Sequence, residues 1–125
     1  MTLQRNSLSN ATKMIFSDFK KIVIKVGSSS IVDSSSEDVK TKWLKSLCKD
    51  VKSLHNMNKK ITIVSSGAIA FGKKDISPNK LIKKLDEKQA AAAIGQIKLA
   101  KEWKDAFKKY SINIAQILLT LDDSE

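Results

Sequence analysis

Small and polar residues follow the ends of three apolar segments of this sequence. Residues 25–29 read Lys-Val-Gly-Ser-Ser, residues 65–68 read Ser-Ser-Gly-Ala, and residues 120–123 read Thr-Leu-Asp-Asp. Loops of small residues let backbone N–H groups approach an anion closely, and a helix that starts after such a loop adds unpaired N–H groups. Neither small-residue loop matches a Walker A motif or a dinucleotide-binding fingerprint. A phosphate site at these loops is therefore a hypothesis.

Lys25 lies near the end of an otherwise apolar segment. A buried ammonium group is unfavourable unless an anion pairs with it. In one interpretation Lys25 clamps a phosphate and offsets the charge that develops on a phosphoryl group during transfer. In the other it is a strand lysine that extends into solvent or pairs with Asp122 or Asp123. The residue pattern does not decide between them.

Three β-branched, apolar segments predict the strands that would position these loops. Residues 21–26, 60–65 and 112–120 each resemble a strand that is buried on both faces. Helical segments separate them, so the order favours an α/β fold in which two right-handed crossovers build a parallel sheet. In such sheets, ligands bind at the carboxyl ends of the strands, where the small-residue loops lie.

The segments between the strands predict helices. Ser34 and Glu37 are spaced as a capping box, and the helix after them is expected to end near residues 56–58. A short helix from residue 68 to about 73 is closed by Gly72, and a long one runs from about Asp86 to residue 110. The apolar faces of the first and last of these helices are predicted to hold Val39, Trp43, Leu44, Leu47, Cys48, Val51 and Leu54, and Ala93, Ile97, Ala100, Trp103, Ala106, Phe107 and Tyr110.

Smaller features complete this prediction. We expect a short helix around residues 14–19, a flexible turn at residues 27–30 and a loop at residues 75–79. Gly95 lets the long helix pack closely on a neighbour or on a ligand. His55, the only histidine, is expected at a helix end or on the surface.

The length of 125 residues fits one domain, which we place at residues 21–125 after a polar leader at residues 1–20. A single cysteine, Cys48, rules out an internal disulfide or a cysteine-based metal site, which favours a reducing compartment and a cytoplasmic location. We expect Cys48 to be a core residue and no metal to be bound by the chain. The longest apolar runs are far shorter than a membrane span, and no membrane partner is expected.

The net charge of +10 raises the alternative of a basic binding module for nucleic acid. Of the 23 basic residues, however, only Arg5 is an arginine, and the lysines are dispersed along the chain. Proteins that read phosphates or bases favour the bidentate guanidinium group, usually with stacking aromatic side chains. We therefore expect a solvated lysine-rich surface and no nucleic-acid partner.

Four blocks of the sequence, in this order and spacing, resemble the N-terminal part of the glutamate 5-kinases, a branch of the amino acid kinase family. They are residues 24–29 (IKVGSS), 64–72 (VSSGAIAFG), 88–96 (KQAAAAIGQ) and 116–120 (QILLT). The resemblance covers about residues 21–123. It implies a three-layer α/β sandwich with a mainly parallel sheet, of which this chain is an incomplete N-terminal portion. It also implies phosphorylation of the γ-carboxylate of L-glutamate by ATP with Mg²⁺, which opens proline biosynthesis.

The same resemblance implies roles for individual residues. Lys25 matches the lysine that contacts the ATP phosphates and stabilises the transferring group. Gly27 and Ser28 match the adjoining turn beside the phosphates. Ser66 matches the serine that contacts glutamate, and Gly67 and Ala68 form the rest of that loop.

The family's chains continue far beyond residue 125, where they carry the nucleotide-binding half and the rest of the glutamate pocket. In addition, Leu121 replaces a residue that is often basic, and the segment after Gly72 lacks an expected Leu-Gly. We therefore expect a truncated form that is inactive alone. Two hypotheses stay open: a working part whose missing half a separate chain supplies, and a non-catalytic remnant. The expected protein partners are this complementing chain or further copies in a homo-oligomer.

Overall fold

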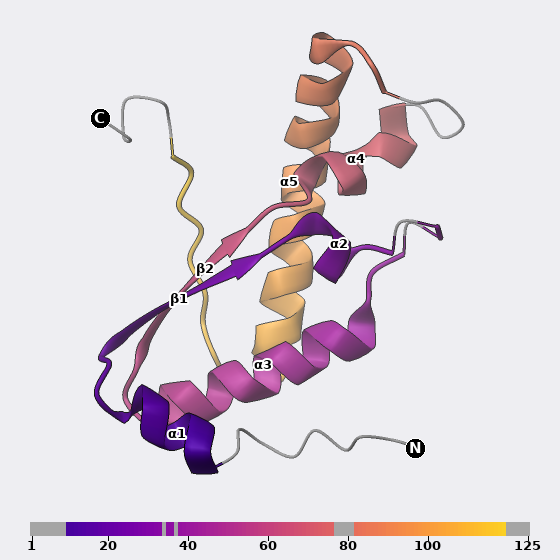
Figure 1. Ribbon diagram of the computed structural model, residues 1–125. Coiled ribbons are helices and arrows are strands. Elements are labelled where there is room, and N and C mark those ends of the chain that lie inside the picture. Colours follow the sequence, from indigo (N-terminus) through magenta and orange to yellow (C-terminus); the bar gives the residue numbers. More distant parts are fainter. Residues whose placement is uncertain (1–9, 34, 37, 77–81, 120–125) are drawn as a thin grey trace.

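The computed structural model describes residues 10–33, 35–36, 38–76 and 82–119. Two strands, β1 (Lys21–Val26) and β2 (Lys60–Ser65), form a parallel sheet (Figure 1). Their register pairs Lys21 with Lys60 at one end and Val26 with Ser65 at the other. The two strands have the predicted bounds, and the predicted α/β class with a parallel sheet is confirmed.

Five helices accompany the sheet in the described residues. They are α1 (Asn10–Ser17), α2 (Ser28–Ile31), α3 (Thr41–Asn56), α4 (Ala68–Ile76) and α5 (Leu85–Lys108). Helix α3 is the crossover between the strands, and α4 and α5 follow β2 (Figure 1). In the described residues, no helix is long and apolar enough to cross a membrane.

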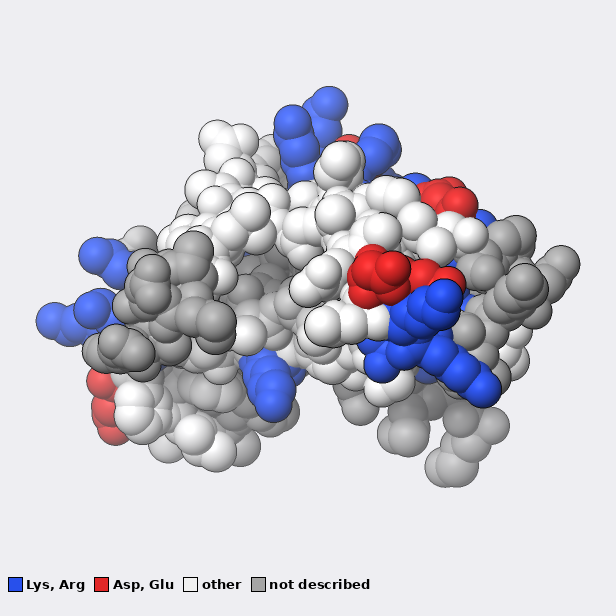
Figure 2. Space-filling model, turned by 90° about the horizontal axis from the view of Figure 1, so that it is seen from above, with Lys and Arg blue, Asp and Glu red and all other residues white. Residues whose placement is uncertain are grey.

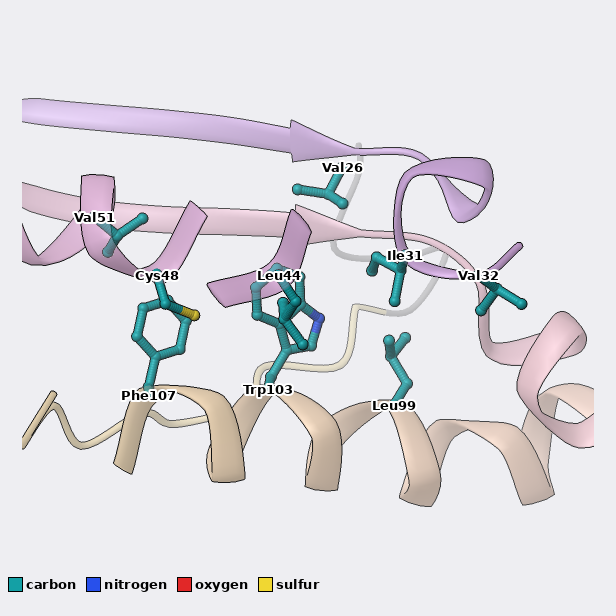
Figure 3. Packing of buried hydrophobic residues seen from close by; sticks show 9 residues of the cluster. All are labelled: Val26, Ile31, Val32, Leu44, Cys48, Val51, Leu99, Trp103 and Phe107. Carbon is teal, nitrogen blue, oxygen red and sulfur yellow. The ribbon is translucent and has the colours of Figure 1, made fainter. Parts of the chain in front are cut away.

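The hydrophobic core lies between one face of the sheet and helices α3 and α5 (Figure 3). Val26 points from β1 toward this core, and Trp103 of α5 stacks on Phe107 with 5.9 Å between the ring centroids. The buried members of the cluster are Val26, Ile31, Val32, Leu44, Cys48, Val51, Leu99, Trp103 and Phe107. The predicted core roles of Cys48, Trp103 and Phe107 are confirmed.

The strands are not buried on both faces in the described part of the chain. Val23 and Val64 belong to the face opposite the core, and their exposed fractions are 68% and 51%. Side chains alternate along a strand, so the covered face takes Ile24 and Ile63 while the other takes these valines. A purely apolar run marks residues suited to burial, but another layer must be present to bury them.

The predicted third strand is also wrong for residues 112–119. These residues follow α5 as irregular chain, and in the described region no other segment pairs with them as a strand. Ile117 is 80% and Leu119 is 79% exposed. A strand is stable only when its backbone pairs with a neighbouring strand. The sequence pattern shows the β propensity of residues 112–119, but it does not show whether a neighbouring strand is present. Thr120 lies outside the described residues.

The segment between β1 and α3 differs from its prediction as well. Residues 28–31 form a short helix, α2, where a flexible turn was expected. Helix α3 begins at Thr41 and its N-cap, Lys40, makes no side-chain capping hydrogen bond. Val39 precedes the helix and forms an isolated bridge with Val32, so it is not part of the helical stripe. The proposed capping residues, Ser34 and Glu37, lie outside the described residues.

An aspartate organises this segment. The Asp33 carboxylate accepts hydrogen bonds from the backbone N–H groups of Ser35 and Ser36, at 2.9 and 3.2 Å, and from the Ser35 hydroxyl. These bonds, led by the one from the Ser35 side chain, lower the pKa of Asp33 to about 2. The ionised side chain of Asp33 therefore holds Ser35 and Ser36 in place ahead of α3.

Helices α4 and α5 cross at two glycines. Gly72 does not end its helix, which continues to Ile76. A Cβ atom on Gly72 would lie 2.8 Å from the Gly95 nitrogen, and one on Gly95 would lie 2.6 Å from the Gly72 nitrogen. Both glycines are therefore required for close helix packing, and the expectation for Gly95 is confirmed.

The buried face of α5 recurs every four residues. It consists of Ala91, Gly95, Leu99, Trp103 and Phe107. The predicted arc was wrong at Ala93 and Ile97, which are exposed, Ile97 by 75%. Gly95 explains why the buried face differs from the predicted one. Its contact with α4 places the face that contains Gly95 toward the core, so Ile97 lies on the exposed side of α5. The helix begins at Leu85, one residue before the predicted start.

Cys48 supplies a testable prediction about the core. Its side chain has no exposed surface, and burial raises the pKa of the thiol to about 11. At pH 8 about one thiol in a thousand is then ionised, and the thiolate is the reactive form. We expect a disulfide reagent such as DTNB to label the native chain at least about 100-fold more slowly than the chain in guanidinium chloride. Complete labelling of the native chain at the denatured rate would contradict this packing.

Candidate functional site

The ends of β1 and β2 bring the two small-residue loops together. The strands are parallel and in register, so both carboxyl ends lie at the same edge of the sheet. The backbone N–H of Ser66 donates to the Val26 carbonyl oxygen at 3.0 Å, and the Ser66 hydroxyl donates to the same oxygen at 3.3 Å. The two small-residue loops are therefore joined by hydrogen bonds, and they lie at the edge of the sheet where the sequence predicted a ligand site.

The first loop leaves open space beside its glycine. Gly27 is the N-cap of α2, with φ −74° and ψ 158°, and a Cβ atom there would meet nothing within 4 Å. The Gly27 carbonyl accepts from the Ser30 N–H at 3.1 Å, and the Ser28 carbonyl accepts from the Val32 N–H at 2.9 Å. These bonds hold the turn, and the absent side chain leaves room for a ligand near Gly27.

The second loop is held by a glycine in an unusual conformation. Gly67 has φ +120°, which residues with a side chain rarely adopt. A Cβ atom on Gly67 would lie 3.5 Å from the Cα atom of Ser28, so the two loops are in contact at this point. Ala68 directly after it begins α4. The loops therefore form one continuous surface above the strand ends.

Lys25 belongs to the same end of the sheet. Lys25 precedes Gly27 by two residues, and its backbone pairs with Val64 of β2. Its side chain is exposed and lies on the sheet face that the core does not occupy, because it follows Val23 by two positions. An exposed side chain is compatible with both interpretations of Lys25, a phosphate clamp and a strand lysine that extends into solvent, and Asp122 and Asp123 lie outside the described residues. Lys25 is therefore free to reach a ligand from the open side of the sheet.

One contact at this edge was not foreseen from the sequence. The indole nitrogen of Trp103 donates to the Ser65 hydroxyl at 3.1 Å. Trp103 was predicted only as a core residue. A buried indole N–H requires an acceptor, and Ser65 is a polar residue on the core face of a strand end. This need for an acceptor is the signal that could have suggested the contact.

A cleft lies away from the strand ends. This cleft of about 240 Å³ is lined by Asp38, Val39, Ala70, Phe71, Lys74, Lys98, Lys101 and Glu102. Two of the lysines that line it form ion pairs: Lys74 lies 3.8 Å from Asp38, and Lys98 lies 2.6 Å from Asp75. Both pairs are exposed, so they contribute little to stability. Each lysine that lines the cleft therefore already has a carboxylate partner, which for Lys101 is Asp105.

The basic residues do not form one continuous patch on the face that Figure 2 shows. Lysine side chains stand there in separate groups, and acidic side chains lie beside some of them (Figure 2). Among the described residues, no group of three or more His, Cys, Asp or Glu could hold a metal ion. The exposed His55 is in the last turn of α3.

Comparison with known proteins identifies the family. Residues 20–125 match the family model described as "Amino acid kinase family". The chain belongs to the amino acid kinase family. Three of the four blocks that suggested this resemblance, residues 24–29, 64–72 and 88–96, lie at the strand ends and in the packing of α4 against α5.

Curated members of the family cover most of this chain. The glutamate 5-kinase of Pelagibacter ubique (strain HTCC1062) is 49% identical over 112 residues, which are 90% of this chain and 30% of that protein. The glutamate 5-kinase of Rhodospirillum rubrum is 48% identical over 103 residues, or 82% and 28%. That of Rhodopseudomonas palustris (strain HaA2) is 44% identical over 108 residues, or 86% and 29%. The chain thus spans about 30% of the length of these relatives, at their N-terminal side.

Proposed function

We propose that this chain takes part in the ATP-dependent phosphorylation of the γ-carboxylate of L-glutamate, the step that opens proline biosynthesis. The observation that carries the proposal is the junction of the two strand-end loops through Ser66 and the Val26 carbonyl. It brings a candidate phosphate loop next to a candidate substrate loop. The three relatives described above are glutamate 5-kinases, which supports the choice of substrate.

We assign the two loops to the two substrates. Lys25, Gly27 and Ser28 would contact the phosphates of ATP. Ser66, Gly67 and Ala68 would contact glutamate. Because Gly67 lies beside Ser28, the γ-carboxylate and the γ-phosphate would meet between the two loops.

This arrangement suits a reaction that depends on positioning. A carboxylate oxygen of glutamate attacks the γ-phosphorus, the bond to the β-phosphate oxygen breaks, and ADP leaves. The carboxylate is already ionised at neutral pH, so no residue needs to remove a proton. The protein holds the two anions together and offsets their charge, which is the part that an ammonium group and backbone N–H groups perform.

Mg²⁺ accompanies ATP in such reactions and neutralises charge on its phosphates. Among the described residues no acidic cluster fits a metal ion, so we assign none of them as a ligand.

The rest of the site would come from further polypeptide, such as a separate complementing chain, and the chain could also associate as a homo-oligomer. The relatives are about three times longer than the part that this chain matches. Apolar side chains that are exposed on the open sheet face and in residues 112–119, such as Val23 and Ile117, offer a surface for that association. We place the protein in the cytoplasm, in line with its single, reduced cysteine.

The direct test is a coupled ATPase assay with L-glutamate, run on the chain alone and together with the polypeptide that completes the kinase domain. We expect glutamate-dependent ADP release in the completed form and none from the chain alone. Hydroxylamine in the assay should trap the acyl phosphate as a hydroxamate, which separates transfer to glutamate from simple ATP hydrolysis. Absence of the hydroxamate with every partner would refute the proposed activity.

A further inference from the structure

A hydrogen-bonded path connects the core helix α5 to the candidate substrate loop. It begins at Trp103, whose side chain is 7% exposed and stacked against Phe107. Its indole N–H donates to the hydroxyl of Ser65 at 3.1 Å, across 38 positions of sequence. Stacking fixes the plane of the indole ring, so the direction of its N–H bond is fixed as well.

Ser65 passes this constraint to the next residue. Its hydroxyl donates to the carbonyl oxygen of Ser66 at 3.3 Å. A serine hydroxyl has one hydrogen to donate, and an indole N–H can only donate. The path therefore runs in one direction, from Trp103 to Ser65 and from Ser65 to the peptide that joins Ser66 to Gly67.

Ser66 is thereby held from two sides. Its N–H and its hydroxyl both donate to the Val26 carbonyl oxygen of β1, and its carbonyl accepts from Ser65. The peptide plane that precedes Gly67 is consequently not free to rotate. Fixed groups of this kind raise binding and rate because the ligand does not have to order them.

We propose that Trp103 and Ser65 are positioning residues that fix the Ser66–Gly67 peptide in the orientation that the glutamate site requires. This inference rests on the proposed function, because it takes the loop of Ser66 as the glutamate loop. Neither residue touches the substrate. Their effect is on the orientation of the loop that does.

Two variants of nearly equal shape separate this role from packing. Ser65→Thr keeps a hydroxyl at position 65, and Ser65→Val replaces it with a methyl group of similar size. The valine variant leaves the Trp103 N–H without its acceptor and the Ser66 carbonyl without its donor. Any effect of added volume is common to both variants, so the difference between them reports the hydroxyl.

The first measurement concerns the loop itself and needs no substrate. In ¹⁵N NMR spectra of the 125-residue chain, Ser65→Val should move the Trp103 indole resonance and the Gly67 amide resonance, whereas Ser65→Thr should leave both near their original positions. Trp43→Phe assigns the indole signals, since the chain has two tryptophans. An unmoved Gly67 amide in Ser65→Val would overturn the inference, whatever the chain's activity.

The second measurement uses the form of the protein that phosphorylates glutamate. We expect the KM for glutamate to be about three- to tenfold higher in Ser65→Val than in Ser65→Thr, which corresponds to one partly buried hydrogen bond. The KM for ATP should differ by less than about twofold. If the unsubstituted protein is active and the two variants have equal KM values for glutamate, the positioning role of Ser65 and Trp103 is overturned and the proposed function is not affected. An original protein that fails to use glutamate overturns the proposed function, and the inference falls with it.

Discussion

Lys25→Ala is expected to lower the rate of glutamate-dependent phosphoryl transfer by about 100- to 1000-fold, the range found when one fixed donor to a developing charge is removed. Lys25 lies two residues before Gly27, at the end of the sheet where the loops of Ser28 and Gly67 touch. Its side chain is exposed, so its loss leaves no cavity in the core. The measurement is the rate of hydroxamate formation at saturating ATP and glutamate.

Lys21 provides a matched control for this variant. It belongs to the same strand and the same open face, and it is exposed like Lys25, but it lies at the opposite end of β1. Lys21→Ala removes the same charge from the chain and should change the rate by less than about twofold. Equal losses in the two variants would show that Lys25 contributes only to the overall charge. Lys25→Arg should retain part of the activity, because it keeps a cation with a different geometry.

Gly95→Ala is expected to have the largest effect on folding. The added Cβ atom would overlap the Ala68 carbonyl oxygen and lie 2.6 Å from the Gly72 nitrogen, both of which are backbone atoms of α4. Backbone cannot rotate aside as a long side chain does, so the two helices must separate. We expect a loss of about 3 kcal/mol in the free energy of unfolding, net of the higher helix propensity of alanine. The melting temperature should fall by about 10 °C.

Gly27→Ala is the control for Gly95→Ala. Gly27 has φ −74°, which alanine adopts without strain, and a Cβ atom there meets nothing within 4 Å. Its melting temperature should stay the same or rise slightly, because alanine restricts the unfolded chain. The two thermal unfolding curves, followed by circular dichroism, decide the matter. A Gly95→Ala curve that coincides with that of Gly27→Ala would contradict the close crossing of α4 and α5.

The sequence predicted the parts of this fold that depend on local pattern. Both observed strands have the bounds expected from their β-branched runs, and their small-residue ends meet as parallel pairing requires. The end of α3 at Asn56 and the burial of Cys48 were also predicted correctly. These features follow from periodicity and residue type within one segment.

The errors arose where distant parts of the chain determine the outcome. Ile97 was expected in the core, but the contact of Gly95 with α4 decides which face of α5 is buried. Residues 112–119 have the composition of a strand, but no strand of the described structure pairs with them. The Trp103–Ser65 hydrogen bond joins residues that are 38 positions apart, which is too far for a local sequence pattern to connect them. The roles of Lys25, Ser66 and their neighbours came from the family resemblance, and they stay predictions.

The parallel pairing of β1 with β2 also determines when the candidate site exists during folding. Lys21 pairs with Lys60, so the sheet forms only after a loop of about 40 residues has closed, whereas α4 and α5 are near neighbours in the chain. Contacts of long sequence separation form slowly. We therefore expect the helical pair to form early and the strand ends to meet late. Partial opening that separates the strands would then remove the ligand loops while the helices persist, so binding of ligand would select the fully assembled chain.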